Sequence, residues 1–217
     1  SGKSTTVKML TGLLEPTGGC VLHRGMNIRT HMIGYKCVLG YVPEEPYLYP
    51  YLTGREYLQL AGRLHDLPEK RMNEKIDALL NLFSLFEHRF TAIASYSKGM
   101  KQKILIMAAL LHDPEVLIFD EPLSGLDVTS ALVFRNLVRC LAEKGKTILY
   151  SSHVLEVVEK ICTRVMILRQ GKVVAHDSVD RLRTLLQSPS LEDVFAQLVV
   201  QEDTGKTANE MAAVMSA

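Results

Sequence analysis

The chain has 217 residues, of which 47% are hydrophobic, and its 25 lysine and arginine residues nearly balance 24 acidic ones. This composition is typical of one globular domain or two closely packed subdomains. The net charge of +1 excludes a broadly basic protein, so we expect no nucleic-acid partner. The longest apolar stretch, 104–111, is far shorter than the roughly 20 residues that a membrane-spanning helix needs.

The first half of the chain predicts a helix, two short strands and a helical segment. Apolar residues at helical spacing predict a helix over 3–14, which a Pro/Gly-rich turn ends before the β-like residues 20–24. A second strand is predicted over 38–42. Thr53-Gly54-Arg55-Glu56 has the spacing of a capping box, and residues from about 53 to about 111 indicate a helical insert.

The second half alternates short apolar runs with amphipathic helices. The runs predict strands over 116–119, 147–150 and 165–168. This rhythm is typical of an α/β fold, with a parallel sheet covered by helices on both faces. Gln170-Gly171 predicts a hairpin from the last run to 173–175, and the composition of 201–217 predicts a loosely held tail.

The cysteines and histidines predict no metal centre. Cys20, Cys37, Cys140 and Cys162 are widely spaced and form no C-x-x-C pair, and the histidines are scattered. We therefore expect four reduced thiols in the core and no transition-metal site.

The start of the chain carries a phosphate-binding pattern. Gly2-Lys3-Ser4-Thr5 before a helix matches the second half of G-x-x-x-x-G-K-[ST], whose backbone amides cradle phosphates. In this interpretation Lys3 reaches the β- and γ-phosphates and the Ser4 hydroxyl binds Mg²⁺. The tetrapeptide alone is also common by chance.

Two further segments fit phosphate chemistry. Asp120 and Glu121 follow an apolar strand, so Asp120 could hold a metal through a bound water and Glu121 could deprotonate the attacking water. Ser97 and Gly99 open a predicted helix and could contact a second phosphate. The alternatives are strand-end acids that lead into a turn at Pro122, and an ordinary helix N-cap at Ser97.

Taken together, these motifs resemble those of the ATP-binding cassette (ABC) transporter ATPases, and within them the exporter-type subunits that serve separate membrane permeases. The resemblance covers nearly the whole chain. The matching positions are the end of the Walker A loop at 2–5, Glu44 where a glutamine usually joins the two subdomains, the signature motif at 97–101, Walker B at 117–121, the D-loop at 124–127 and the switch histidine at His153. Alone, a histidine after Ser151-Ser152 is more often a hydrogen-bonded histidine at a strand end; its position within the motif series favours the switch histidine.

The resemblance implies a P-loop NTPase fold, with a parallel-sheet RecA-like core and a helical subdomain. It implies one ABC ATPase domain over 1–200, with the helical subdomain inserted at about 46–111, followed by the tail at 201–217. It also implies a head-to-tail pair of ATPase domains, as a homodimer or pseudo-dimer, that holds ATP and Mg²⁺ between them.

The family's functional residues can be carried over to the matching positions. The resemblance implies catalytic roles for Lys3, Glu121 and His153, and Mg²⁺ ligands at Ser4, Asp120 and Glu44. The implied nucleotide contacts are Ser1, Gly2, Lys3, Ser4, Thr5, Glu44, Ser97, Gly99 and Asp127. Asp127 is equally suited to cap the helix that starts at Val128.

The chain departs from the family pattern at three places. Lys98 replaces a glycine of the signature motif, and we hypothesise that it adds positive charge near phosphate. Glu44 replaces the usual glutamine; its carboxylate can still ligate Mg²⁺, or Glu44 and Glu45 are solvated loop acids. The chain also starts inside the phosphate loop, so we expect residues 1–217 alone to bind ATP poorly and to be inactive, whereas the full gene product hydrolyses ATP.

The expected function is an ATPase subunit that powers transport, with export favoured, through a partner transmembrane permease. Its place is then the cytoplasmic side of the membrane, as a peripheral protein. Tyr47, Tyr49 and Tyr51 lie where the family receives the permease, although such a cluster is also typical of local packing. Residues 191–195 resemble a helix of exporter-type members. The alternatives are a non-transport ABC ATPase and a degenerate, non-catalytic cassette that acts as an interaction module.

Overall fold

The computed structural model describes residues 1–199 and 214–215. The chain divides into two compact units, one of residues 4–153 and one that joins residues 1–3 to the residues from 154 onward. The predicted tail, 201–217, lies outside the described residues except for 214 and 215. The division into a domain at 1–200 and an insert at 46–111 stays a prediction.

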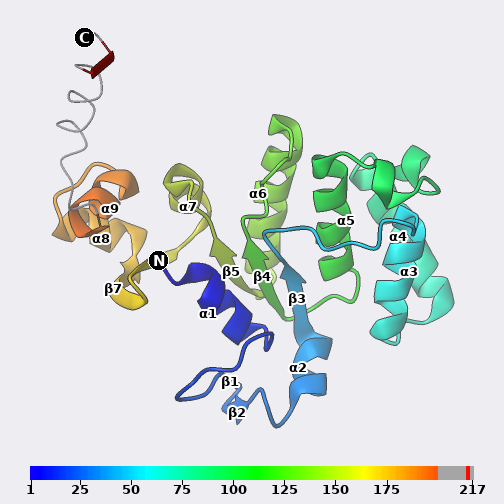
Figure 1. Cartoon of the computed structure of the whole chain (residues 1–217), viewed down its shortest axis with the longest axis horizontal. Coiled ribbons are helices and arrows are strands. Elements are labelled where there is room, and N and C mark those ends of the chain that lie inside the picture. Colours follow the sequence, from blue (N-terminus) through cyan, green and yellow to red (C-terminus); the bar gives the residue numbers. More distant parts are fainter. Residues whose placement is uncertain (200–213, 216–217) are drawn as a thin grey trace. The chain divides into compact units, whose positions relative to one another are not determined.

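The larger unit is built on a three-stranded parallel sheet. Its order is β3 (Leu39–Val42), β4 (Val116–Asp120) and β5 (Thr147–Ser151), as Figure 1 shows. The central strand β4 is buried from its second residue onward, as an apolar run in a parallel sheet requires. The strands predicted over 116–119 and 147–150 are therefore confirmed.

Helices cover both faces of this sheet. Ile118 packs in a cluster with Val7 of α1 (Lys3–Leu10) and Tyr35 of α2 (Met32–Val38). Phe119 contacts Phe134 of α6 (Val128–Glu143) edge to face, with ring centroids 5.1 Å apart. Successive residues of a strand point to opposite faces, so the two packing layers lie on opposite sides of β4.

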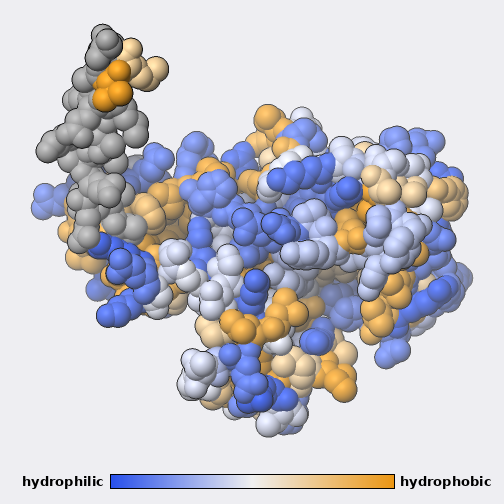
Figure 2. All heavy atoms as spheres, in the orientation of Figure 1, coloured by the Kyte–Doolittle hydropathy of each residue, from blue (hydrophilic) through white to orange (hydrophobic). Residues whose placement is uncertain are grey.

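The first helix is shorter than its sequence pattern predicts. α1 ends at Leu10, and the Thr11 hydroxyl then donates a hydrogen bond to the carbonyl oxygen of Val7. Gly12 follows with a φ of +73°, a left-handed conformation that ends a helix. A short hairpin, β1 (Leu22–His23) and β2 (Met26–Asn27), comes next, with Leu22 and Met26 exposed. The lower end of Figure 2 shows apolar patches among hydrophilic side chains.

The helical segment, residues 54–111, lies beside β3 in Figure 1. It contains α3 (Gly54–Leu64), α4 (Glu69–Leu82), the 3-10 turns η1 (Phe86–His88) and η2 (Ile93–Ser95), and α5 (Lys98–Leu110). The capping box at Thr53 and Glu56 is confirmed, because each side chain bonds the backbone amide of the other. Its core consists of Leu58, Met72, Ile76, Leu80, Leu85, Ile93, Tyr96, Ile104, Met107 and Leu111.

The smaller unit contains a hairpin and three short helices. They are α7 (Leu155–Ile161), β6 (Arg164–Arg169), β7 (Lys172–Ser178), α8 (Val179–Leu185) and α9 (Leu191–Val199). The predicted hairpin is confirmed, because Gln170 and Gly171 take positive φ angles of +50° and +75° between two antiparallel strands. Among the described residues β6 pairs only with β7, so the parallel sheet does not extend to 165–168.

The prediction that the cysteines are core thiols is wrong. Cys20, Cys37 and Cys140 are exposed, and Cys162 is half-buried; all four are free thiols. Cys140 lies on the solvent side of α6, because the buried side of that helix is set by Phe134 and Val138. None of the helices in the described part of the chain is long and apolar enough to span a membrane.

Candidate functional site

The carboxyl ends of β4 and β5 place buried polar groups side by side. Asp120 ends β4 and pairs in register with Ser151, which ends β5; the two residues are 4% and 8% exposed. Among the described residues, the Asp120 carboxylate has no hydrogen-bond or ion-pair partner, and neither does the Ser151 hydroxyl oxygen. Buried polar groups are nearly always paired, so the buried Ser151 hydroxyl beside an unbonded carboxylate indicates a place where a ligand could bind.

Glu121 is held at this edge by its backbone and by both of its carboxylate oxygens. Its φ of +48° is uncommon for a residue other than glycine, and its amide donates to the Ser151 carbonyl oxygen at 3.0 Å. Its Oε2 accepts from the Ser152 hydroxyl at 3.2 Å, and its Oε1 lies 2.9 Å from His153 Nδ1. The Glu121 side chain is 12% exposed and that of His153 is 77% exposed, so the pair joins a sheltered carboxylate to a ring in solvent. We call Asp120, Glu121, Ser151 and Ser152 the carboxyl edge.

Glu44 approaches the same edge from β3. Burial raises the pKa of Tyr41, and the carboxylates of Asp120 and Glu44 raise it further because they disfavour a phenolate. Both carboxylates therefore lie near one phenol. Glu44 is itself exposed, so its interpretation as a solvated loop acid stays open.

The phosphate-loop residues divide between the two units. Lys3 begins α1, and Ser1, Gly2 and Lys3 belong to the smaller unit, where the Ser1 carbonyl oxygen accepts from the Gly171 amide at 3.0 Å. Ser4 and Thr5 belong to the larger unit and lie exposed in the first turn of α1.

Ser97 and Gly99 stand at the start of α5. Ser97 is the N-cap, and its hydroxyl accepts from the Met100 amide at 3.2 Å. A Cβ added to Gly99 would lie 2.5 Å from the Gly125 carbonyl oxygen, so only glycine fits against the loop after Glu121. The capping role of Ser97 is confirmed, and its phosphate contact stays a prediction.

Asp127 caps α6, as its position before Val128 predicts. Its Oδ1 accepts from the Ser130 amide at 2.8 Å, and its Oδ2 accepts from the Ser130 hydroxyl at 2.6 Å. These bonds hold the pKa of Asp127 below its ordinary value. The cap is exposed, so the same residue remains open to a partner surface.

Sequence reasoning assigned no role to several residues that complete this region. Ser151 and Ser152 bond Glu121, and Gln102, which is 1% exposed, donates from Nε2 to the Pro122 carbonyl oxygen at 3.1 Å. The two serines could have been found from their place at the carboxyl end of the predicted strand that became β5. Gln102 lies three residues after Gly99, on the same side of α5, which is the signal that could have indicated it.

The donor set at the carboxyl edge fits Mg²⁺ and a nucleotide phosphate. Carboxylate and hydroxyl oxygens are the ligands that Mg²⁺ prefers, and Asp120 and Ser151 supply such atoms side by side at this edge. Among the described residues, no hydrogen bond or ion pair joins Ser4 to them, so the ligand set with Ser4 and Glu44 stays a prediction. The unpaired Asp120 carboxylate is the group that a cation would neutralise. Glu121 and His153 form a close carboxylate–imidazole pair whose ring is open to solvent, an arrangement that is chemically able to transfer a proton.

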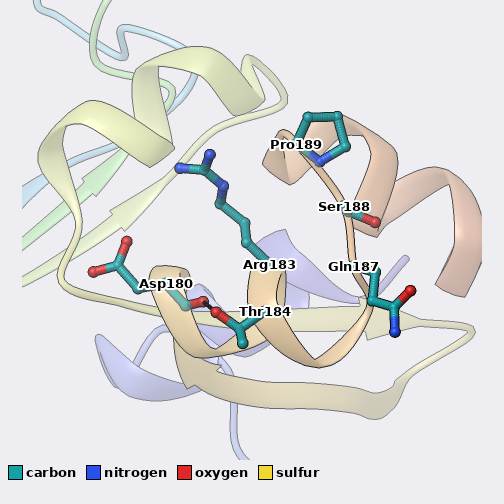
Figure 3. Close-up of a pocket in the computed structure, with 6 residues that line it drawn as sticks. All are labelled: Asp180, Arg183, Thr184, Gln187, Ser188 and Pro189. Carbon is teal, nitrogen blue, oxygen red and sulfur yellow. Dashed lines mark hydrogen bonds between the residues drawn. The ribbon is translucent and has the colours of Figure 1, made fainter.

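A separate hollow of about 550 Å³ lies in the smaller unit. In Figure 3 its lining comes from α8 and from the segment that follows it, namely Asp180, Arg183, Thr184, Gln187, Ser188 and Pro189. Arg183 Nη1 lies 3.0 Å from Glu159 Oε1. Because that guanidinium is already balanced, we assign no ligand to this hollow.

Comparison with known proteins identifies the family. The family model described as ABC transporter matches residues 1–124. The chain is 34% identical over 202 residues to the ABC transporter ATP-binding protein NatA of Bacillus subtilis, covering 93% of this chain and 82% of that protein. It is 33% identical over 207 residues to the ABC-type transporter ATP-binding protein EcsA of the same organism, covering 94% and 83%.

Longer relatives and a solved structure give the same result. An uncharacterized ABC transporter ATP-binding protein of Nostoc is 41% identical over 184 residues, which are 84% of this chain and 54% of that protein, so the chain spans about half of its length. A solved structure of the ATP-binding subunit of an ABC transporter superposes with a TM-score of 0.85 at 35% identity, covering 91% of this chain and 83% of that one. The chain therefore belongs to the ABC transporter family, as an ATPase subunit with the P-loop NTPase fold.

Proposed function

We propose that this chain hydrolyses ATP at the carboxyl edge and thereby powers transport, in the direction of export, through a partner membrane permease. The observation that carries the proposal is the placement of Glu121. Its amide and both carboxylate oxygens are bonded to Ser151, Ser152 and His153, and it directly follows Asp120, the last residue of β4. A general base needs such a fixed position.

In this mechanism Glu121 accepts a proton from the attacking water. His153 contacts the Glu121 carboxylate through Nδ1. Because the ring is exposed, its Nε2 can reach a γ-phosphate. Protonation of Glu121 weakens its attraction to the ring, which gives His153 a means to sense the reaction. Lys3 neutralises phosphate charge from the start of α1.

Mg²⁺ and ATP are held by oxygen donors of this chain. Ser4, Asp120 and, from the loop after β3, Glu44 are the proposed metal ligands, and Ser1, Gly2 and Thr5 bind phosphate through the helix start. When bound, Mg²⁺ neutralises charge on the β- and γ-phosphates. The unpaired state of Asp120 supports this assignment.

A second ATPase domain completes the site. Ser97 and Gly99 stand at an exposed helix start, where unpaired amides favour phosphate, and they are proposed to contact ATP bound to the other domain. Asp127, exposed at the start of α6, is proposed to face the same partner. The pair is a homodimer or a pseudo-dimer.

The permease is proposed to bind near the exposed tyrosines on the cytoplasmic side of the membrane. Tyr47, Tyr49 and Tyr51 are 79%, 51% and 77% exposed, which supports a docking role over local packing. The proposal of export rests on the resemblance of residues 191–195 to a helix of exporter-type members. These residues lie in α9, where Leu191 and Val194 are buried.

The test compares two glutamate substitutions at opposite ends of β4 in the full gene product. Glu121→Gln is expected to lower phosphate release by about 10²–10⁴-fold, because it removes the base, while ATP binding is kept and an ATP-bound dimer accumulates in light scattering. Glu115→Gln, next to β4 at its other end, should leave turnover within about twofold, because in the described part of the chain the Glu115 side chain pairs only with Arg24, at the surface.

Two outcomes would contradict the proposal in different ways. Near-normal phosphate release by Glu121→Gln excludes Glu121 as the base. Absence of ATP hydrolysis in the parent protein and its permease complex excludes the catalytic function and favours a cassette that only binds partners.

A further inference from the structure

The loop that follows Glu121 rests on the first turns of α5. Gln102 Nε2 donates to the Pro122 carbonyl oxygen, and Lys103 Nζ lies 3.8 Å from Asp127 Oδ2. Between these two contacts, Gly125 meets the start of the helix at Lys98 and Gly99. The loop of residues 122–127 therefore contacts the first turns of α5 at Pro122, Gly125 and Asp127.

Lys98 makes its contact through its aliphatic stem. A Cβ added to Gly125 would lie 2.8 Å from Lys98 Cγ, 3.0 Å from Cδ and 3.3 Å from Cβ. Three successive carbons of the side chain thus run along the Gly125 backbone, while the residue as a whole is exposed. A lysine that packs its stem and leaves its ammonium in water contributes contact area as well as charge.

The same loop is tied directly to Glu121. The Ser124 amide donates to the Glu121 carbonyl oxygen at 3.1 Å, and the Leu126 amide donates to the Leu123 carbonyl oxygen at 3.1 Å. Gly125 is the third residue of the second turn, 123–126, and has a φ of +79°. A shift of Gly125 away from α5 would therefore pull on the backbone of Glu121 through two overlapping turns, 121–124 and 123–126.

We propose that Lys98 is a positioning residue, whose aliphatic stem seats the 122–127 loop on α5 and so fixes the Glu121 carboxylate for catalysis. The inference rests on the proposed function, since it assigns Glu121 as the base. It differs from the hypothesis that the Lys98 charge acts on phosphate, because the stem and the charge can be removed separately.

The first test uses Lys98→Met and Lys98→Ala in the full gene product. Methionine keeps a stem of similar length without charge, so its kcat for ATP should stay within about twofold of the parent. Alanine removes the stem, so kcat should fall about tenfold or more with KM for ATP nearly unchanged, because small displacements of a catalytic group cost up to about 10²-fold. Lys70→Ala, on the exposed first turn of α4, is the control for loss of a surface lysine.

The second test does not depend on catalysis. In hydrogen exchange, the amides of Ser124 and Leu126 should exchange several-fold faster in Lys98→Ala than in the parent, and at the parent rate in Lys98→Met. If the parent does not hydrolyse ATP, the proposed function fails, and these exchange rates decide whether the stem holds the loop. Two results would overturn the inference. An equal loss of kcat in Lys98→Met and Lys98→Ala would assign the effect to the charge. Unchanged kcat and unchanged exchange in Lys98→Ala would show that the stem does not position the loop.

Discussion

The helical segment and the carboxyl edge differ in whether their polar side chains are bonded to other residues. In the helical segment the Tyr96 hydroxyl donates to the His88 carbonyl oxygen at 2.7 Å, and Arg55 pairs with Asp77 and Asn73. At the carboxyl edge, Asp120 and Ser151 are buried without such partners among the described residues. The polar side chains of the helical segment bond one another, whereas those at the carboxyl edge are left to bind a ligand.

The largest expected loss of stability comes from the core of the helical segment. Leu58 is fully buried there, so Leu58→Ala should lower the free energy of unfolding by about 2–5 kcal/mol, measured by urea denaturation. Leu60→Ala, on the same helix and 36% exposed, is the matched control and should cost far less. Equal losses in the two variants would show that the segment is not the tightly packed region that the comparison requires.

A smaller effect is expected from two histidines, His65 and His112, that lie where the helical segment meets β3. His112 stacks on His65 with ring centroids 3.6 Å apart, and its Nε2 lies 3.1 Å from the Leu39 carbonyl oxygen. That bond makes Nε2 the donor and leaves the buried Nδ1 without a partner among the described residues. Burial lowers the pKa of His112 to about 4, and repulsion from His65 and Lys75 adds to this, while the Leu39 bond and Asp113 oppose it.

The pH dependence follows from the direction of that shift. Between pH 6.5 and pH 4 the unfolded chain binds a proton at His112 that the folded chain does not, so stability is lost as the pH falls through this window. Because the site is only half-buried, we expect a loss of about 1–2 kcal/mol. As the pH falls from 6.5 to 4, the free energy of unfolding, taken from denaturation curves at each pH, should fall more for the parent than for His112→Gln. Equal falls in the two proteins would contradict the account.

Local signals in the sequence predicted the parts of the fold that depend on neighbouring residues. The capping box at Thr53, the helix cap at Asp127 and the turn at Gln170 and Gly171 are each decided within four residues, and all three are confirmed. Walker-like residues Asp120 and Glu121 could be placed at a strand end for the same reason.

Contacts between distant segments could not be predicted in this way. The bond from Gln102 to Pro122 joins residues that the sequence does not connect, and the pairing of Ser151 with Asp120 depends on strand order. The exposure of Cys140 could have been predicted from helix geometry, but all four cysteines were expected in the core because of their residue type. Cys140 lies two residues, or about 200° of helix rotation, after the buried Val138, which places it toward solvent.

The most direct test of the central claim measures the stability of Asp120→Asn with and without Mg²⁺ and ATP, in the full gene product. Without ligand, the variant should match or exceed the parent, because Asp120 makes no side-chain hydrogen bond or ion pair among the described residues that the substitution would break. With Mg·ATP at about 100 times its Kd, the parent should gain about 2.7 kcal/mol and the variant far less. A variant that is destabilised without ligand, yet gains as much as the parent from Mg·ATP, would contradict the assignment of the carboxyl edge as a site completed by Mg²⁺ and nucleotide.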